Sequence, residues 1–217
     1  MQPQIQQART VFYGVLSLLF MDKAAQKNPG ELARLLKAIE ESGFDEAACQ
    51  AAATLKATCE DAEGLEAMDE EFSELFILPF GQRIPLTASI YHDEREAGAP
   101  LLKVKEVLNL AALRRESAHF SDHEDNFGFV FTLMAHLIRQ GIEEDDNAQL
   151  VAANALYEGV IKPYAPQFAD RVLSAPRAHL YKAAAQLLNR FLIAEAEFYE
   201  TLGAMAGMNT PRSGARL

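Results

Sequence analysis

Three side chains in the middle of the sequence could together bind a metal ion: Glu116, His119 and His123. On one helix His119 and His123 would share a face, and with Glu116 they would supply three ligands for zinc. Glu116-x-x-His119 is also half of a di-iron carboxylate motif, but the sequence lacks the second Glu-x-x-His that such a site needs. A metal-dependent helical enzyme is therefore one hypothesis, and a solvated polar turn is the preferred interpretation. We predict no metal site.

Motifs of the common cofactor and nucleophile sites are absent from the sequence. It contains no Gly-x-x-x-x-Gly-Lys-Ser/Thr, no Gly-x-Gly-x-x-Gly and no Gly-x-Ser-x-Gly. Its 31 acidic and 20 basic residues give a net charge of −11, which repels nucleic acids and would attract a basic peptide. Solubility alone also explains this charge. We expect a protein with no catalytic residues, no cofactor and no nucleic-acid partner.

A polar cluster at residues 122–126 directly precedes a strongly apolar segment. It consists of Asp122, His123, Glu124, Asp125 and Asn126. Carboxylates at a helix N-terminus are stabilised by the helix dipole, which is one explanation of the cluster. The functional alternative is recognition of arginine, because a carboxylate accepts two parallel hydrogen bonds from a guanidinium group. In that case Glu124 and Asp125 would form an acidic rim, and Asp125→Ala would weaken peptide binding with little effect on folding.

A second cluster joins apolar residues to a proline-bearing loop. Leu75 and Phe76 end an amphipathic segment, and Pro85, Ser89 and Tyr91 follow. The apolar pair has the spacing of a helix core. Together with the loop, the same residues could instead form the wall of a groove for an apolar peptide segment.

The elements that position these clusters are predicted to be helices. Apolar residues recur with helical spacing at 32–39, 45–60, 64–76, 99–115, 127–138, 145–159 and 176–202. Pro163 and Pro166 predict a break in the chain, and Pro176 predicts the start of the last long helix, in which Glu195 would need a partner. We expect an all-α, single-domain helical bundle of about eight to ten helices over residues 1–208, followed by a flexible C-terminal tail at 209–217.

Cysteine content and hydropathy bear on the compartment. Cys49 and Cys59 lie ten residues apart in one predicted helix, too far for a disulfide, and unpaired thiols fit a reducing cytoplasm. The apolar run at 11–21 is too short to span a bilayer and is interpreted as a buried first helix. We therefore expect a cytoplasmic protein without stable membrane insertion.

Both clusters resemble motifs of the TorD/DmsD/NarJ family of redox-enzyme maturation chaperones. The family pattern of Leu-Phe, a loop and Pro-x-Trp-Glu-Ser-Val-Tyr is matched at Leu75, Phe76, Pro85, Ser89 and Tyr91, while Thr87 and Ala88 replace the Trp and Glu. The family pattern of Pro-Glu-Asp-His, Ile-Gly and Phe-Met-Ala-His-Leu is matched at Glu124, Asp125, Gly128 and 134–137, while His123 and Asn126 replace the Pro and His. Asp122-His123 is an alternative match for Asp-His, which would shift the helix register by three residues.

The resemblance implies a TorD-like fold and a non-enzymatic function. Such chaperones bind the twin-arginine signal peptide of the catalytic subunit of a molybdenum or tungsten oxidoreductase and assist its cofactor insertion before export. The resemblance places the peptide site at Leu75, Phe76, Pro85, Ser89, Tyr91, His123, Glu124, Asp125 and Asn126. An assembly factor for a non-exported redox subunit is a further alternative. We expect a monomer, and a domain-swapped dimer with a hinge at 77–98 or 159–166 remains the alternative.

Overall fold

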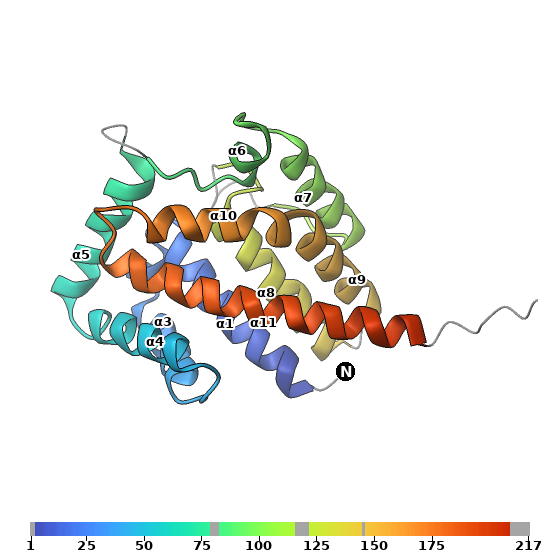
Figure 1. Ribbon diagram of the computed structural model, residues 1–217, viewed down its shortest axis with the longest axis horizontal. Helices are drawn as coiled ribbons and strands as arrows, with labels where there is room; N and C mark the ends of the chain where they lie inside the picture. Colours follow the sequence, from blue (N-terminus) through green and yellow to red (C-terminus); the bar gives the residue numbers. More distant parts are fainter. Residues whose placement is uncertain (1–2, 79–82, 116–121, 145, 209–217) are drawn as a thin grey trace, which may run out of the picture.

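The computed structural model describes residues 3–78, 83–115, 122–144 and 146–208, which fold into a single bundle of helices (Figure 1). Over these ranges, extended pairing is limited to an isolated antiparallel bridge between Thr87 and Asn126. The described helices include none that is both long and apolar enough to cross a membrane. The predicted all-α fold is confirmed. The predicted tail at 209–217 lies outside the described residues.

The order of the elements agrees with the helical periodicity of the sequence. They are α1 (Pro3–Phe20), α2 (Ala24–Lys27), α3 (Pro29–Glu40), α4 (Glu46–Thr58), α5 (Ala62–Phe72), the π-helix η1 (Ser73–Ile77), α6 (Ala88–Asp93), α7 (Ala99–Leu110), α8 (Phe127–Glu143), α9 (Asn147–Leu156), the π-helix η2 (Tyr157–Ile161), α10 (Lys162–Leu173) and α11 (Leu180–Met208).

Helices α1 and α8 form the centre of the bundle, and α10 and α11 cover them on the side that faces the viewer in Figure 1. Phe20 of α1 and Phe127 and Phe131 of α8 are completely buried. Gly128 lets the start of α8 approach the end of α1, because a Cβ atom at this position would lie 2.5 Å from the carbonyl oxygen of Phe20. The strongly apolar segment after residue 126, predicted to be helical at 127–138, is therefore the buried central helix α8.

A carboxylate from another helix caps the start of α11. Glu71 of α5 accepts hydrogen bonds from the backbone N–H groups of His179, Leu180 and Tyr181 at 2.7–2.9 Å. These amides have no partner inside the helix, and the helix dipole adds a favourable interaction with the negative charge. The predicted start of this helix at Pro176 is wrong, since α11 begins at Leu180 and Pro176 lies in the preceding turn.

The predicted break at Pro163 and Pro166 is also wrong. The chain remains helical from α9 through η2 into α10, with Pro163 in the first turn of α10 and Pro166 inside it. A proline ring collides with the carbonyl group four residues earlier in a regular α-helix. The wider π turn of η2, in which the Lys162 N–H donates to the Tyr157 carbonyl, contains the carbonyl four residues before Pro163 and accommodates this proline without a loop. The segment 159–166 is thus helix, and the loop expected there as a hinge is absent.

Helix α7 ends five residues before the predicted Arg115. Ala112 has a left-handed backbone with φ 55°, a conformation that usually requires glycine. The Ala112 N–H donates to Asn109 O at 3.1 Å, and the Leu113 N–H donates to Leu108 O at 2.8 Å. This pair of bonds is the Schellman pattern that terminates helices, here with alanine at the left-handed position.

A buried ion pair joins α1 to α11. Arg9 donates to both carboxylate oxygens of Glu195 at 2.7 Å, and the Tyr13 hydroxyl donates to the same carboxylate at 2.6 Å. The Arg9 guanidinium also lies 4.1 Å from the centre of the Phe198 ring. Burial alone would lower the pKa of Arg9, but the hydrogen bond and negative charge of Glu195 raise it above its ordinary value. The partner that Glu195 was predicted to need is therefore Arg9.

The left-handed residue gives a first prediction. We expect Ala112→Gly to increase the free energy of unfolding by about 0.5–1 kcal/mol, because glycine removes the steric cost of the positive φ at an exposed position. Urea denaturation measures the change as a higher midpoint at constant slope. Ala111→Gly is the matched control and should destabilise, since Ala111 is buried and has φ −84°. Equal effects of the two substitutions would contradict the explanation.

The buried ion pair gives a second prediction. Arg9→Met leaves the Glu195 carboxylate buried without its cation, so the free energy of unfolding should fall by about 3–5 kcal/mol. Adding Glu195→Gln removes the charge, keeps an acceptor for Tyr13 and should recover most of the loss. Urea denaturation of both variants tests this pair. A double variant no more stable than Arg9→Met would show that packing, rather than the unpaired charge, dominates.

Candidate functional site

The fold brings the two clusters together. The Ala88 N–H donates to Asp125 O at 2.9 Å, and the Phe127 N–H donates to Leu86 O at 2.8 Å. These bonds flank the bridge between Thr87 and Asn126, so the strand-like residues before α6 run beside the residues before α8. Residues from the two motifs therefore share one site, as their interpretation as a joint binding region requires.

A buried carboxylate locks this junction. Asp125 Oδ2 accepts a hydrogen bond from the Ser89 N–H at 2.8 Å and a second from the Ser89 hydroxyl at 2.5 Å. Ser89 Oγ in turn accepts from the Gly98 N–H at 2.9 Å, which extends the connection to the start of α7. Asp125 and Ser89 are both 0% exposed. They therefore hold the site together and do not form its surface.

The predicted acidic rim of Glu124 and Asp125 must be corrected. Asp125 is buried, and the Glu124 side chain is only 13% exposed, with its carboxylate 3.5 Å from Arg115 Nε. Arg115 also donates to the carbonyl oxygen of Asp122 at 2.6 Å. Because both carboxylates already have partners within the chain, they are poorly placed to bind an external arginine.

Asn126 has a structural role at the same junction. Its side-chain oxygen accepts from the Gly128 N–H at 2.9 Å and caps α8. Its side-chain nitrogen donates to Asp122 Oδ2 at 3.0 Å. Asp122 and His123 are exposed, so Asn126 holds an exposed carboxylate against the start of α8.

The apolar members of the first motif contribute to the core. Leu75 and Phe76 are 1% and 3% exposed, and the Phe76 ring packs edge-on against Phe20 and Tyr181. They lie in η1, and π-helical turns often occur at functional sites. The next residue, Ile77, remains 45% exposed. Leu75 and Phe76, which were predicted to form the wall of a groove, therefore belong largely to the core. The exposed apolar surface of η1 comes from Ile77.

Pro85 and Tyr91 fix the shape of the segment before α6. The Tyr91 hydroxyl donates to the Pro85 carbonyl at 2.8 Å, and the Tyr91 ring is 8% exposed. The Arg171 guanidinium lies 4.6 Å from the centre of this ring. Burial raises the pKa of Tyr91, and the nearby positive charge of Arg171 opposes the shift. Tyr91 thus connects α6 to α10 through its contact with Arg171.

The first cleft is a hollow of about 380 Å³ where the two motifs meet. Apolar atoms come from Phe76, Ile77 and Leu86, and carboxylates come from Asp122 and Glu96. The remaining lining residues are Arg83, Thr87, His123 and Asn126. This hollow, called the mixed cleft below, combines apolar walls with exposed negative charge, which is the surface that a basic and partly apolar segment requires.

Sequence reasoning missed five residues that line the mixed cleft: Ile77, Arg83, Leu86, Thr87 and Glu96. One signal was available, because residues 75–78 are consecutively apolar and one helix cannot bury all of them. Ile77 and Leu78 are accordingly 45% and 42% exposed. Glu96 follows α6 in a turn, and the sequence contains no signal that this residue faces residues 122–126.

The hypothetical metal ligands are only partly described. Glu116 and His119 lie outside the described residues, and His123 is exposed at the mixed cleft. Elsewhere in the described chain, no group of three or more His, Cys, Asp or Glu side chains is arranged to hold a metal ion.

The fold is an all-helical bundle with a surface cleft where the two motifs meet, and comparison with known families identifies the class of protein. The model of the nitrate reductase delta subunit family matches residues 41–170, more than half of the chain. The chain therefore belongs to this family of NarJ- and TorD-like chaperones, as its motifs predicted. Curated proteins include no match to the chain.

Family membership establishes the general role. The nitrate reductase delta subunit family consists of maturation chaperones that act with molybdoenzyme subunits and are not catalytic. The matched residues include both motifs and the whole mixed cleft. They end before Arg171 and exclude α1 and α11.

The junction gives a third prediction, which replaces the expectation that Asp125→Ala spares the fold. Removing the buried carboxylate leaves the N–H and hydroxyl of Ser89 without an acceptor, so the free energy of unfolding should fall by about 2–4 kcal/mol. Asp122→Ala, at an exposed neighbour, should change it by less than about 1 kcal/mol. Urea denaturation distinguishes them. An Asp125→Ala protein of unchanged stability would refute the structural role.

Proposed function

We propose that this chaperone binds the twin-arginine signal peptide of the catalytic subunit of a molybdenum or tungsten oxidoreductase. It holds that subunit in the cytoplasm until the cofactor is inserted. The observation that carries the proposal is the mixed cleft, in which two exposed carboxylates line the same hollow as the exposed side chain of Ile77. Family membership supports the redox-enzyme client, and the chemistry of the cleft supports a basic, partly apolar ligand.

Asp122 and Glu96 are the residues that we assign to the arginines of the peptide. Both line the mixed cleft, whereas Glu124 is paired with Arg115 and Asp125 is buried. Asn126 restrains the Asp122 carboxylate through its side-chain amide, so less conformational freedom is lost when a guanidinium binds. Arginine is preferred over lysine, because its planar group can donate two parallel hydrogen bonds to one carboxylate.

The apolar part of a signal peptide would lie against Ile77 and Leu86. Ile77 is 45% exposed, and burying such surface contributes about 25 cal/mol per Å². Phe76 supports this wall from the core through its contacts with Phe72 and Phe168. His123, which also lines the cleft, supplies a ring that can pack or donate a hydrogen bond. The peptide-binding role predicted for Phe76 and His123 is retained in this proposal, with Phe76 acting as support.

Binding of a signal peptide with its native arginine pair provides the fourth prediction. Asp122→Asn combined with Glu96→Gln should weaken binding about tenfold, because two charge-assisted contacts become neutral. Fluorescence anisotropy with a labelled peptide measures the affinity, and added salt should weaken the wild-type complex more than the variant complex. Glu66→Gln, an exposed carboxylate on α5 outside the mixed cleft, is the matched control and should bind like wild type.

A second peptide, in which glutamines replace both arginines, separates the proposal from its alternative. Loss of affinity for this peptide supports recognition of the arginine pair. Equal affinity for the two peptides would contradict it and would favour an assembly factor for a redox subunit that is not exported. Full affinity of the Asp122→Asn/Glu96→Gln variant would remove the mixed cleft from the proposal.

A further inference from the structure

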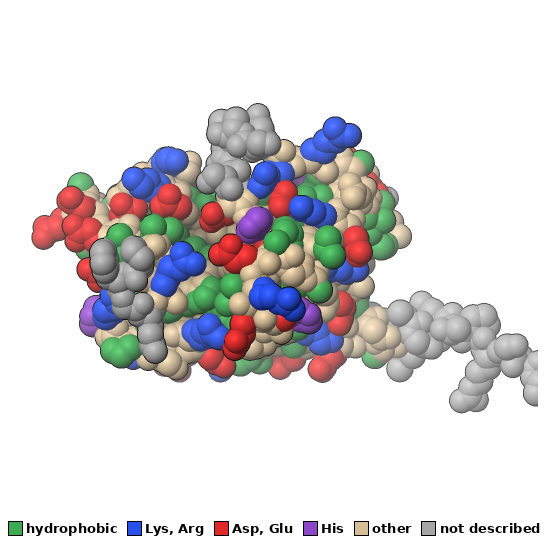
Figure 2. Space-filling model, turned by 90° about the horizontal axis from the view of Figure 1, so that it is seen from above, with side chains coloured by type: hydrophobic (Ala, Val, Ile, Leu, Met, Phe, Trp, Pro, Cys, Tyr) green, Lys and Arg blue, Asp and Glu red, His purple; other side chains and the backbone are tan. Residues whose placement is uncertain are grey.

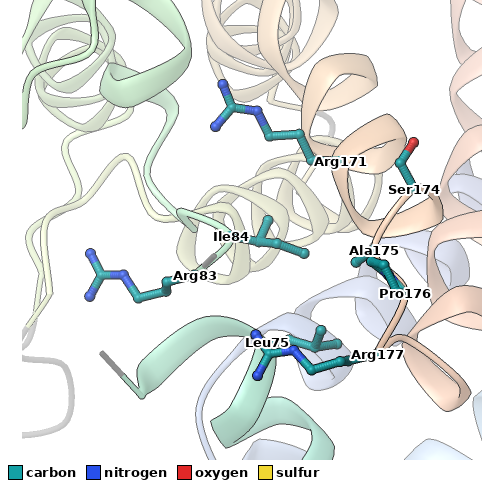
Figure 3. A pocket seen from close by; sticks show the side chains of 8 residues that line it. All are labelled: Leu75, Arg83, Ile84, Arg171, Ser174, Ala175, Pro176 and Arg177. Atoms are coloured by element: carbon teal, nitrogen blue, oxygen red, sulfur yellow. The ribbon is translucent and has the colours of Figure 1, made fainter. Parts of the chain in front are cut away.

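A second cleft, of about 720 Å³, lies beside the mixed cleft and has the opposite charge. Three arginines surround it: Arg83 before α6, Arg171 of α10 and Arg177 in the turn before α11 (Figure 3). Leu75 and Ile84 lie between them, and Ser174, Ala175 and Pro176 complete the lining. We call this hollow the arginine cleft. Figure 2, viewed toward α6 and α10, shows basic and acidic side chains interspersed around apolar side chains on this side of the molecule.

The three guanidinium groups are available to a ligand. All three side chains belong to exposed residues, and within the described residues none of them forms a hydrogen bond or ion pair. Arg171 is oriented by its position over the Tyr91 ring. Like charges around one hollow repel one another, and a chain with net charge −11 has many carboxylates that could neutralise them. Such an arrangement is expected where an anionic ligand supplies the missing charge.

The lining favours carboxylates on a peptide over a phosphate group. Phosphate sites in proteins typically use backbone N–H groups at a helix N-terminus or in a glycine-rich loop. The amides at the start of α11, next to Arg177, already donate to Glu71, and no glycine among the described residues lines the cleft. Leu75, Ile84 and Pro176 instead offer apolar contacts between the charges. A peptide that carries both carboxylates and apolar side chains is complementary to this surface.

We propose that the arginine cleft is a second peptide-binding site, which takes an acidic segment of a protein partner containing interspersed apolar residues. Arg171 and Arg177 would each bind a carboxylate of that segment, and Leu75 and Ile84 would contact its apolar side chains. Arg83 lines both clefts, so the two sites share an edge and can be occupied by neighbouring parts of one client. The inference does not depend on signal-peptide binding, because Arg171 and Arg177, which would bind the carboxylates, line the arginine cleft and not the mixed cleft.

Binding of a short labelled peptide that alternates glutamate with leucine tests the proposal, and is the fifth prediction. Arg171→Gln combined with Arg177→Gln should weaken binding about tenfold by fluorescence anisotropy. Replacing Arg171→Gln by Arg171→Lys in the double variant should recover little of the lost affinity, since lysine keeps the charge and loses the planar pair of donors. Arg139→Gln, an exposed arginine on α8 outside the arginine cleft, is the control and should leave the affinity unchanged. Unchanged urea midpoints would confirm that the variants fold.

Two further measurements decide the outcome. The twin-arginine peptide should bind the Arg171→Gln/Arg177→Gln variant at least as tightly as wild type, so failure of one site is distinguishable from failure of the other. Inorganic pyrophosphate should compete with the acidic peptide only weakly. The proposal would be overturned if the acidic peptide bound wild type and the double variant equally well. It would also be overturned if pyrophosphate bound more tightly than the peptide and displaced it.

Discussion

The site depends on one buried interaction, the pair of hydrogen bonds from Ser89 to the Asp125 carboxylate. A buried charge is costly unless it is hydrogen-bonded, so this pair strongly favours a single alignment of the segment before α6 with the segment before α8. The alignment places Thr87 beside Asn126 and opens the mixed cleft on its exposed side. The motif residues that look most suited to ligand binding are therefore the ones that build the cleft.

Electrostatics around the cleft follows from which charges already have partners. Glu71 caps α11, Glu124 pairs with Arg115, and Asp125 holds Ser89, so these acidic residues contribute little free negative charge at the surface. Asp122 and Glu96 remain exposed in the mixed cleft. A net charge of −11 describes the whole molecule, whereas the charged residues that line the mixed cleft are these two carboxylates and Arg83.

Periodicity and resemblance predicted the helical fold and the meeting of the two motifs, because apolar spacing records which faces are buried. Local chemistry that depends on distant partners could not be predicted. Pro163 looks like a helix breaker, but the π turn at η2 accommodates it. The start of α11 depends on Glu71, more than a hundred positions earlier. Likewise, the exposure of Asp125 cannot be inferred without knowing that Ser89 lies against it.

The two clefts place opposite charges on either side of Arg83, and this polarity constrains how a client can bind. A basic segment is attracted to Asp122 and Glu96 and repelled by Arg171 and Arg177, so it can enter only one of the two hollows favourably. An acidic segment has the reverse preference. Repulsion between like charges opposes the wrong placement, and attraction between opposite charges favours the right one. The pair of clefts can therefore orient a chain whose charge changes sign along its length.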